Sequence, residues 1–113
     1  MNTAKESRDA MREANDLDFS SAVRSSGVTL VDFGATWCPP CKALLPVIET
    51  LASEYGERVE IVKVDTDESP ETASAFGVMS NPTVILFSDG QPVEKLVGLR
   101  PIDVYRSALN RYV

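Results

Sequence analysis

The segment from residue 28 to residue 64 constrains the fold most, because its pattern indicates a strand, a long helix and a second strand. Residues 28–34 are apolar at nearly every position, which is typical of a central strand covered on both faces. A helical pattern of apolar residues runs from residue 38 to about residue 55, and residues 59–64 predict the next strand. Two strands joined in this way run parallel, with a right-handed crossover.

Two shorter helices are expected outside this unit. Asp16 or Asp18 can cap a helix that runs to about Ser26. Ser69 can cap a second short helix, which ends near Gly77. Both predictions rest on local sequence alone, because Ser and Asp side chains accept hydrogen bonds from the free N–H groups of a helix start.

The remaining segments add strands and a final helix. Residues 10–14 form either a short edge strand or a helical turn. Residues 83–87 and 92–97 predict an antiparallel hairpin around Asp89-Gly90, and the proline in the second strand suggests an edge position. A last helix begins at residue 101. The sequence therefore predicts an α/β fold with a mixed central sheet of four to five strands and helices on both faces.

Charge and length narrow the class of protein. The 113 residues suit a single domain, expected over residues 10–113 behind a flexible leader at residues 1–9. The net charge of -6 argues against nucleic acid or an anionic membrane as the main partner. No stretch approaches the ~20 apolar residues of a membrane span, and the leader lacks the apolar core of a signal peptide. We therefore expect a cytoplasmic monomer with no nucleic-acid or membrane partner.

The stretch Trp37-Cys38-Pro39-Pro40-Cys41 holds the only cysteines and the only tryptophan of the chain. Two intervening residues at a helix start bring both sulfurs within bonding distance. The partial positive charge and free N–H groups of the helix N-terminus stabilise a thiolate, so we expect the pKa of the Cys38 thiol to lie below its free value. Cys38, at the exposed terminus, is then the attacking thiolate, and Cys41, one turn further, resolves the mixed disulfide.

Other chemistries fit the sequence less well. The chain has no histidine, which excludes Ser-His-Asp and Cys-His catalysis and His-ligated metal sites. Two cysteines alone do not complete a tetrahedral zinc site, so no metal is expected. Asp32 interrupts the apolar run six positions before Cys38. A buried acid next to the cysteines is the favoured interpretation, and a residue at the solvated end of the strand is the alternative.

These motifs together resemble the active-site region of the thioredoxin family. The resemblance covers about residues 10–113, with its motifs in the family's order and spacing. The matching residues are Val31-Asp32-Phe33, Trp37-Cys38-Pro39-Pro40-Cys41-Lys42, Pro46, Lys63, Asp65, Asp67, Asn81-Pro82-Thr83, Asp89-Gly90 and Gly98. The resemblance implies a thioredoxin fold and a thiol-disulfide oxidoreductase that reduces protein disulfides.

The resemblance also implies roles for individual residues. Asp32 matches the family's buried acid, which exchanges a proton with the second cysteine, here Cys41. Desolvation would raise the pKa of this acid. Lys63 matches the lysine near the acid, whose charge opposes that shift, although a plain exposed strand lysine is the alternative. Pro82 matches the cis-proline that faces the cysteines.

A flat, mostly apolar surface for protein substrates is expected around the sulfurs. Its members are Trp37, Pro39, Pro40, Gly77, Asn81, Pro82 and Gly98. Core filling is the alternative role for Trp37. A segment of extended substrate would pair with the backbone next to Pro82.

Three positions depart from the family pattern. Pro39 replaces the usual glycine and removes an N–H near Cys38, so the reduction potential has to be measured rather than carried over from the family. Gly34 stands where a bulky aromatic residue is common, which leaves either open space or a place for another side chain. Asn81 replaces a branched apolar residue at a position that contacts substrates.

The resemblance implies no cofactor of the protein's own. NADPH and FAD would act only through a partner, thioredoxin reductase, which restores the dithiol after oxidised protein substrates have been reduced. One alternative is an exported thioredoxin-like protein for cytochrome maturation or disulfide formation. The other is a non-catalytic binding subunit, which the complete set of Cys38, Cys41, Asp32 and Pro82 argues against.

Overall fold

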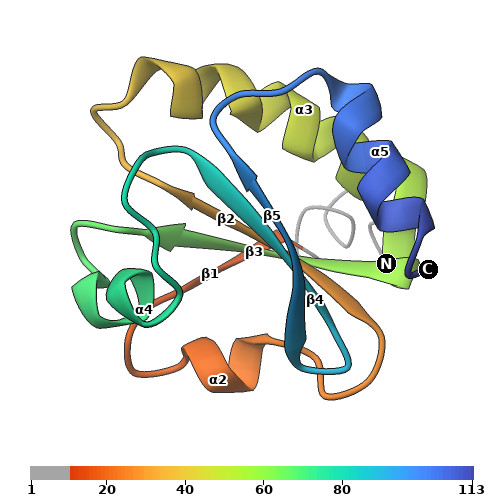
Figure 1. Ribbon diagram of the computed structural model, residues 1–113, viewed down its shortest axis with the longest axis horizontal. Coiled ribbons are helices and arrows are strands. Elements are labelled where there is room, and N and C mark those ends of the chain that lie inside the picture. Colours follow the sequence, from red (N-terminus) through yellow and green to blue (C-terminus); the bar gives the residue numbers. More distant parts are fainter. Residues whose placement is uncertain (1–10) are drawn as a thin grey trace, which may run out of the picture.

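The computed structural model, which describes residues 11–113, confirms a mixed sheet with helices on both faces (Figure 1). The expected leader at residues 1–9 lies outside the described residues. In chain order the elements are β1 (Met11–Ala14), α2 (Phe19–Ala22), β2 (Val28–Gly34), α3 (Pro39–Tyr55), a 3₁₀ turn (Gly56–Arg58), β3 (Val59–Asp65), α4 (Pro70–Ala75), β4 (Thr83–Ser88), β5 (Gln91–Val97) and α5 (Ile102–Asn110).

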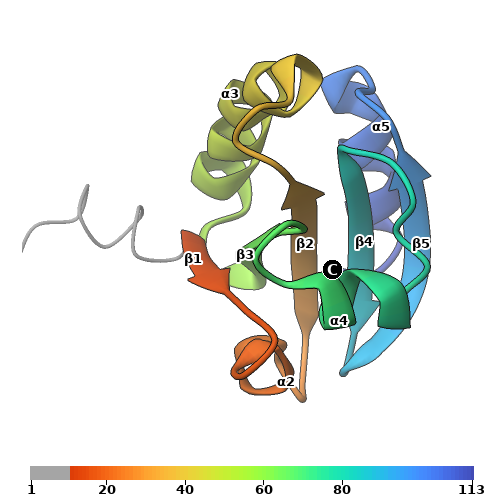
Figure 2. The same ribbon diagram turned by 90° about the vertical axis from the view of Figure 1, so that its left-hand side faces the viewer.

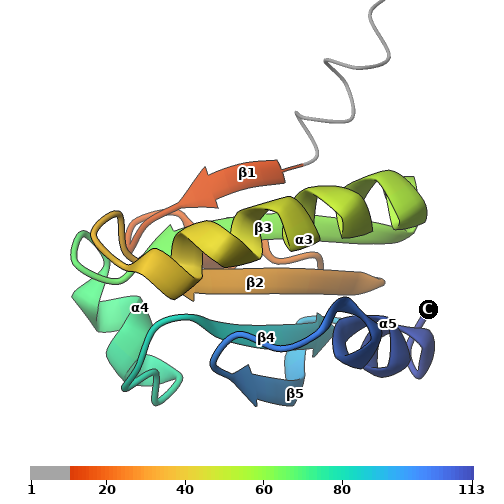
Figure 3. The same cartoon turned by 90° about the horizontal axis from the view of Figure 1, so that it is seen from above.

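Strand β2 lies in the middle of a five-stranded sheet of order β1-β3-β2-β4-β5, which can be followed across Figures 2 and 3. It pairs parallel with β3, as the sequence predicts, and antiparallel with β4, a pairing that the sequence does not specify. Residues 11–14 form a strand at one edge, parallel to β3, rather than a helical turn. Strand β5, which contains Pro92, forms the other edge. Edge placement leaves the missing N–H of this proline outside the ladder.

Two hydrophobic clusters cover the two faces of the sheet, because successive strand residues point to opposite sides. Leu30 packs in the cluster beneath α3 and α5, whereas Val31 packs in the cluster with α2. Figure 1 shows α3 and α5 on one side of the sheet and α2 and α4 on the other. Asp32 has the same parity as Leu30, so its carboxyl group points to the side of α3.

The first helix is shorter than the sequence predicts. It ends at Ala22 instead of about Ser26, and Val23 is already extended, with φ -82° and ψ 128°. The N–H of Arg24 donates to Thr29 Oγ1 at 3.0 Å, which directs the chain into β2. The apolar pattern supplies buried residues only up to this point, so a further turn would have little to bury.

The predicted capping residues do not cap the predicted helices. Asp18 holds the N-cap position of α2 and Ser69 that of α4, but neither side chain makes a capping hydrogen bond. Asp16 caps α4 instead, from the loop after β1. Its carboxylate accepts from the N–H of Thr72 at 2.7 Å, from the Thr72 hydroxyl at 2.6 Å and from the N–H of Glu71 at 3.2 Å. The local sequence does not predict that Asp16 caps α4, because Asp16 and Thr72 are far apart in the chain.

This arrangement predicts opposite effects for two alanine variants. Loss of a serine cap normally lowers the free energy of unfolding by about 1 kcal/mol. Ser69 is fully buried, and its hydroxyl has no hydrogen-bond partner among the described residues. Ser69→Ala should therefore leave the urea unfolding midpoint unchanged or raise it, whereas Asp16→Ala should lower it. A loss of stability in Ser69→Ala that matches the loss in Asp16→Ala would contradict this assignment.

Candidate active site

The two cysteines are joined as a disulfide at the start of α3, so the structure describes the oxidised protein. Cys38 is the N-cap of α3, with an extended backbone at φ -95° and ψ 110°, and Pro39 and Pro40 form the first turn. The Sγ of Cys38 accepts from the N–H of Cys41 at 3.3 Å. The sulfur of Cys38 therefore takes the place that a serine or aspartate oxygen occupies at other helix starts.

The exposure of the two cysteines differs from the prediction. Cys38 is only 3% exposed, whereas Cys41 is half-buried. The carbonyl oxygen of Asn81 lies 3.7 Å from the Sγ of Cys38. The Asn81-Pro82 peptide bond is cis, as the resemblance implies, and this segment lies against Cys38. The expected exposure of Cys38 is therefore wrong for the oxidised protein, in which Cys41 is the more exposed residue of the pair.

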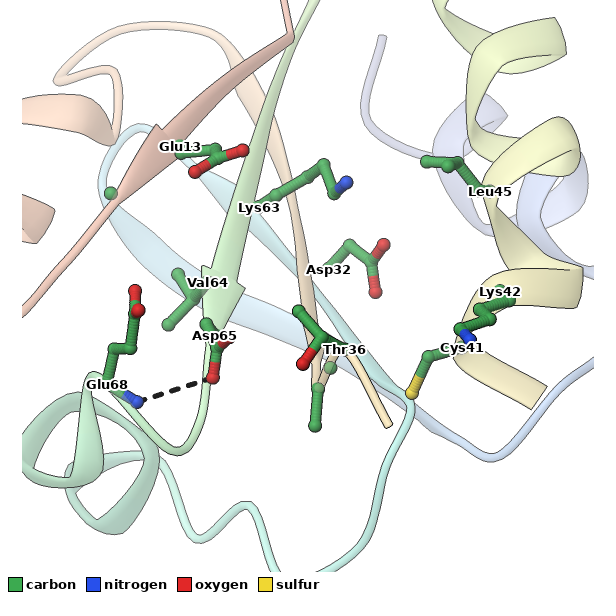
Figure 4. Close-up of a pocket in the computed structure, with 13 residues that line it drawn as sticks. Glu13, Asp32, Thr36, Cys41, Lys42, Leu45, Lys63, Val64, Asp65 and Glu68 are labelled. Atoms are coloured by element: carbon green, nitrogen blue, oxygen red, sulfur yellow. Dashed lines mark hydrogen bonds between the residues drawn. The ribbon is translucent and has the colours of Figure 1, made fainter. Parts of the chain in front are cut away.

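Asp32 is buried, which confirms the favoured interpretation of this residue over a position at the solvated end of the strand. It is 6% exposed, and its Oδ1 has no hydrogen-bond partner among the described residues. Burial raises the pKa of Asp32 to about 6, and the positive charge of Lys63 partly opposes this rise. Lys63 is the register neighbour of Asp32 on β3. In Figure 4, the Asp32 carboxyl group lies between the Lys63 amine and Cys41.

Gly34 lets Cys41 pack directly against the end of β2. A Cβ atom on Gly34 would lie 3.2 Å from the Sγ of Cys41 and 4.0 Å from Oδ1 of Asp32. Cys41 therefore occupies the space next to the Cβ position of Gly34, and a cavity of about 470 Å³ adjoins both residues. Its walls, shown in Figure 4, are Glu13, Ala14, Asp32, Gly34, Ala35, Thr36, Cys41, Lys42, Leu45, Lys63, Val64, Asp65 and Glu68.

Trp37 lies at the surface and does not fill the core. Trp37 is 65% exposed, and its Nε1 donates a hydrogen bond to Oδ2 of Asp67 at 2.6 Å. Sequence reasoning included Asp67 in the resemblance but gave it no role. The same reasoning missed exposed apolar residues in and beside the loops around the site, because a hydrophobic residue in a loop carries no periodicity. These are Met79, Val97 and Leu99.

Thr66 connects the end of β2 to the Asn81-Pro82 segment. Its N–H donates to the carbonyl oxygen of Gly34 at 2.9 Å. The side-chain amide of Asn81 donates to the Thr66 hydroxyl at 3.2 Å. The unusual asparagine is therefore anchored by a hydrogen bond that an apolar residue at this position would not make. Pro82 is buried, while Pro39, Pro40 and part of Gly98 reach the surface.

The raised pKa of Asp32 predicts how stability depends on pH. A carboxyl whose pKa rises from 3.8 to about 6 on folding destabilises the folded state by about 3 kcal/mol at pH 7. Asp32→Asn should remove this cost. The gain in free energy of unfolding should be nearly full above pH 6, should shrink as the pH falls from 6 to 4, and should vanish below the unfolded pKa of 3.8, where the acid is protonated in both states.

Urea titrations of the oxidised protein at several pH values measure this gain. Glu13→Gln, which removes an exposed carboxylate at the same cavity, is the matched control and should show no such pH-dependent gain. A constant difference between Asp32→Asn and the parent from pH 5 to pH 8 would show that the pKa is not raised.

Comparison with known proteins gives consistent matches. The thioredoxin family profile matches residues 10–111. Thioredoxins from Staphylococcus aureus strains Mu50 and MW2 are each 49% identical over 104 residues, covering 92% of this chain and 99% of the relative. The structure of a mutant thioredoxin from Halobacterium salinarum NRC-1 superposes with a TM-score of 0.78 at 38% identity, covering 90% of this chain and 89% of that one.

Proposed function

Because the chain belongs to the thioredoxin family and is a thiol-disulfide oxidoreductase, we propose that it reduces protein disulfides with Cys38 as nucleophile and Cys41 as resolving thiol. The observation that carries this assignment is the position of Cys38 at the N-cap of α3. Its sulfur already accepts an N–H from the first turn, at 3.3 Å. A thiolate formed there gains from that N–H and from the helix dipole, an effect for which thioredoxins are a standard example.

Each step of the reaction balances with the groups present. The Cys38 thiolate attacks a substrate disulfide, forms a mixed disulfide and releases one substrate thiolate. The Cys41 thiol then transfers its proton to Asp32 and attacks the Sγ of Cys38, which releases the second substrate thiolate and forms the intramolecular disulfide. Asp32 suits this role because its pKa of about 6 lies much nearer neutrality than that of an ordinary aspartate.

The surroundings of the sulfurs support a flat docking surface for protein substrates. Trp37 is 65% exposed, and Met79 is 95% exposed in the loop before Pro82. Large exposed apolar side chains near a reactive centre are typical of binding surfaces. Pro39, Pro40, Asn81, Pro82 and Gly98 complete the proposed surface.

We assign reduction of the resulting disulfide, after turnover of protein substrates, to a second protein. The thioredoxin relatives support a partner of the thioredoxin reductase type, in which FAD and NADPH supply the electrons. We propose that this cycle takes place in the cytoplasm and that the protein acts as a monomer. Within residues 11–113, no helix has both the length and the apolar character to cross a membrane.

Replacing the resolving thiol should trap substrates. Cys41→Ser should accumulate mixed disulfides with oxidised protein substrates on Cys38, because the attack that releases them is lost. Cys38→Ser is the matched control, and with protein disulfides such as insulin it should form few adducts and show no turnover. Mass spectrometry after acid quench and non-reducing gels measure both results. Insulin reduction that survives in Cys38→Ser would refute the assignment.

The proton transfer predicts a pH profile for the resolving step. Asp32→Asn should slow release of substrate from Cys38 by up to about a hundredfold, the lower end of the usual general-base contribution. In the parent, the rate should rise with pH through about 6, where Asp32 ionises. Lys63→Met removes the charge that opposes burial, so it should move this rise to higher pH.

Single-turnover reduction of insulin between pH 5 and pH 9 measures these profiles. If Asp32→Asn retained the parent's rate across this range, the proton would have to go elsewhere. A Lys63→Met profile displaced to lower pH would contradict the electrostatic role of the lysine.

A further inference from the structure

The cavity at Gly34 reaches the disulfide from a different side than the proposed docking surface. Within residues 11–113, its walls include Cys41 but not Cys38, and they include none of the residues assigned to the docking surface. Cys41 is half-buried, whereas Cys38 is only 3% exposed. The structure therefore offers an approach to the Sγ of Cys41 that is separate from the surface proposed to bind protein substrates.

Gly34 lies where this approach meets Cys41. Gly34 does not have a positive φ, so its backbone conformation does not require glycine. A Cβ there would lie 3.2 Å from the Sγ and 3.4 Å from the Cβ of Cys41. These contacts are tighter than ordinary van der Waals packing, so any side chain at this position would crowd the sulfur of Cys41. Glycine allows Cys41 to remain where it lines the cavity.

The cavity has the size of a small-molecule site. Its volume is about 470 Å³. Ligand pockets commonly range from about 300 to 1,000 Å³. A folded protein segment does not fit into such a volume, whereas a thiol of a few heavy atoms fits readily.

The charges on the walls favour a ligand that carries an ammonium group. Glu13, Asp65 and Glu68 line the cavity together with Lys42 and Lys63, and Asp32 lies among them. Acidic groups thus outnumber basic ones. Oδ1 of Asp65 already accepts from the N–H groups of Asp67 and Glu68, at 2.8 Å and 3.3 Å. Glu13 and Glu68 form no ion pair with any residue from 11 to 113, so their carboxylates are available to a ligand.

We propose that this cavity admits a low-molecular-weight aminothiol, or its disulfide, to the sulfur of Cys41. The proposal rests on the redox function assigned above and adds a second substrate class to the same disulfide. The ammonium group would lie among the carboxylates of Glu13 and Glu68. The thiol sulfur would reach Cys41 from the cavity, beside Gly34.

The chemistry of this route balances. A small thiolate attacks the Sγ of Cys41, the Cys38–Cys41 bond breaks, and Cys38 leaves as a thiolate. This leaving group is the one that the helix N-terminus stabilises, and a better stabilised thiolate leaves faster. A second small thiolate then attacks the outer sulfur of the mixed disulfide. It releases the small disulfide, and the Cys41 thiolate takes up a proton from solvent or from Asp32. Two thiols are oxidised and the protein disulfide is reduced.

Single-cysteine proteins separate this route from attack at Cys38. Cys38→Ser leaves only Cys41, and Cys41→Ser leaves only Cys38 as the matched control. Each is made with Gly34 and with Gly34→Leu and is treated with cystamine, and the adduct is followed by mass spectrometry per thiolate present. Gly34→Leu should slow the adduct on Cys41 by about tenfold, the equivalent of a modest overpacking cost, with less than about a twofold effect on Cys38.

A charge series tests the ligand class. Cystamine, 2-hydroxyethyl disulfide and dithiodiglycolate carry positive, neutral and negative ends, and each rate on Cys41 is divided by the rate of the same compound on Cys38. This ratio should favour cystamine over the neutral compound by up to about fivefold, as expected for partly exposed charge pairs. The Glu13→Gln, Glu68→Gln double variant should remove the preference. Both positions are at the surface, so this variant tests the proposal even if Gly34→Leu does not fold.

Each outcome decides the proposal. Equal slowing of both cysteines by Gly34→Leu, or slowing of neither, would overturn the access route. A ratio that is the same for the three compounds would overturn the aminothiol class. Failure of the proposed protein-reductase function would show instead as missing protein adducts on Cys38 in Cys41→Ser, a result that leaves the cystamine measurements unaffected.

Discussion

The structure depends on the burial of strand β2 between two neighbouring strands and two helical layers. Nearly every residue of this strand is buried, and it pairs with β3 on one side and β4 on the other. Its end therefore has a defined position relative to α3, which begins a few residues later. The disulfide, the acid and the open cavity all lie at this end of one rigid strand.

That rigidity allows the sheet to hold a carboxyl group where it is unfavourable. Asp32 occupies a position whose parity places it among the apolar residues beneath α3. Burial without a hydrogen-bond partner for Oδ1 raises its pKa, and the neighbouring charge of Lys63 keeps the rise moderate. The same environment that destabilises the ionised form suits Asp32 to the base role proposed above, beside Cys41. Under that proposal, stability and function oppose each other at this residue.

A charged cavity borders Cys41, Asp32 and Lys63 beside Gly34. The cis-proline segment lies against Cys38 from another side, and Thr66 links that segment to the end of β2. The two sulfurs consequently face different surroundings. This difference is the physical basis for assigning them different partners.

The sequence by itself determined the strands, the parallel β2–β3 unit and the cysteine pair. Apolar periodicity and the two-residue spacing of the cysteines are local properties of the sequence, so they do not depend on how the elements pack. Tertiary structure decided that Asp16 caps α4, that Asp32 is buried, and that Cys41 rather than Cys38 borders a cavity. Each of these depends on contacts between residues far apart in the chain. A single sequence carries no local signal for such contacts, because the partner is chosen only when the sheet and its helices come together.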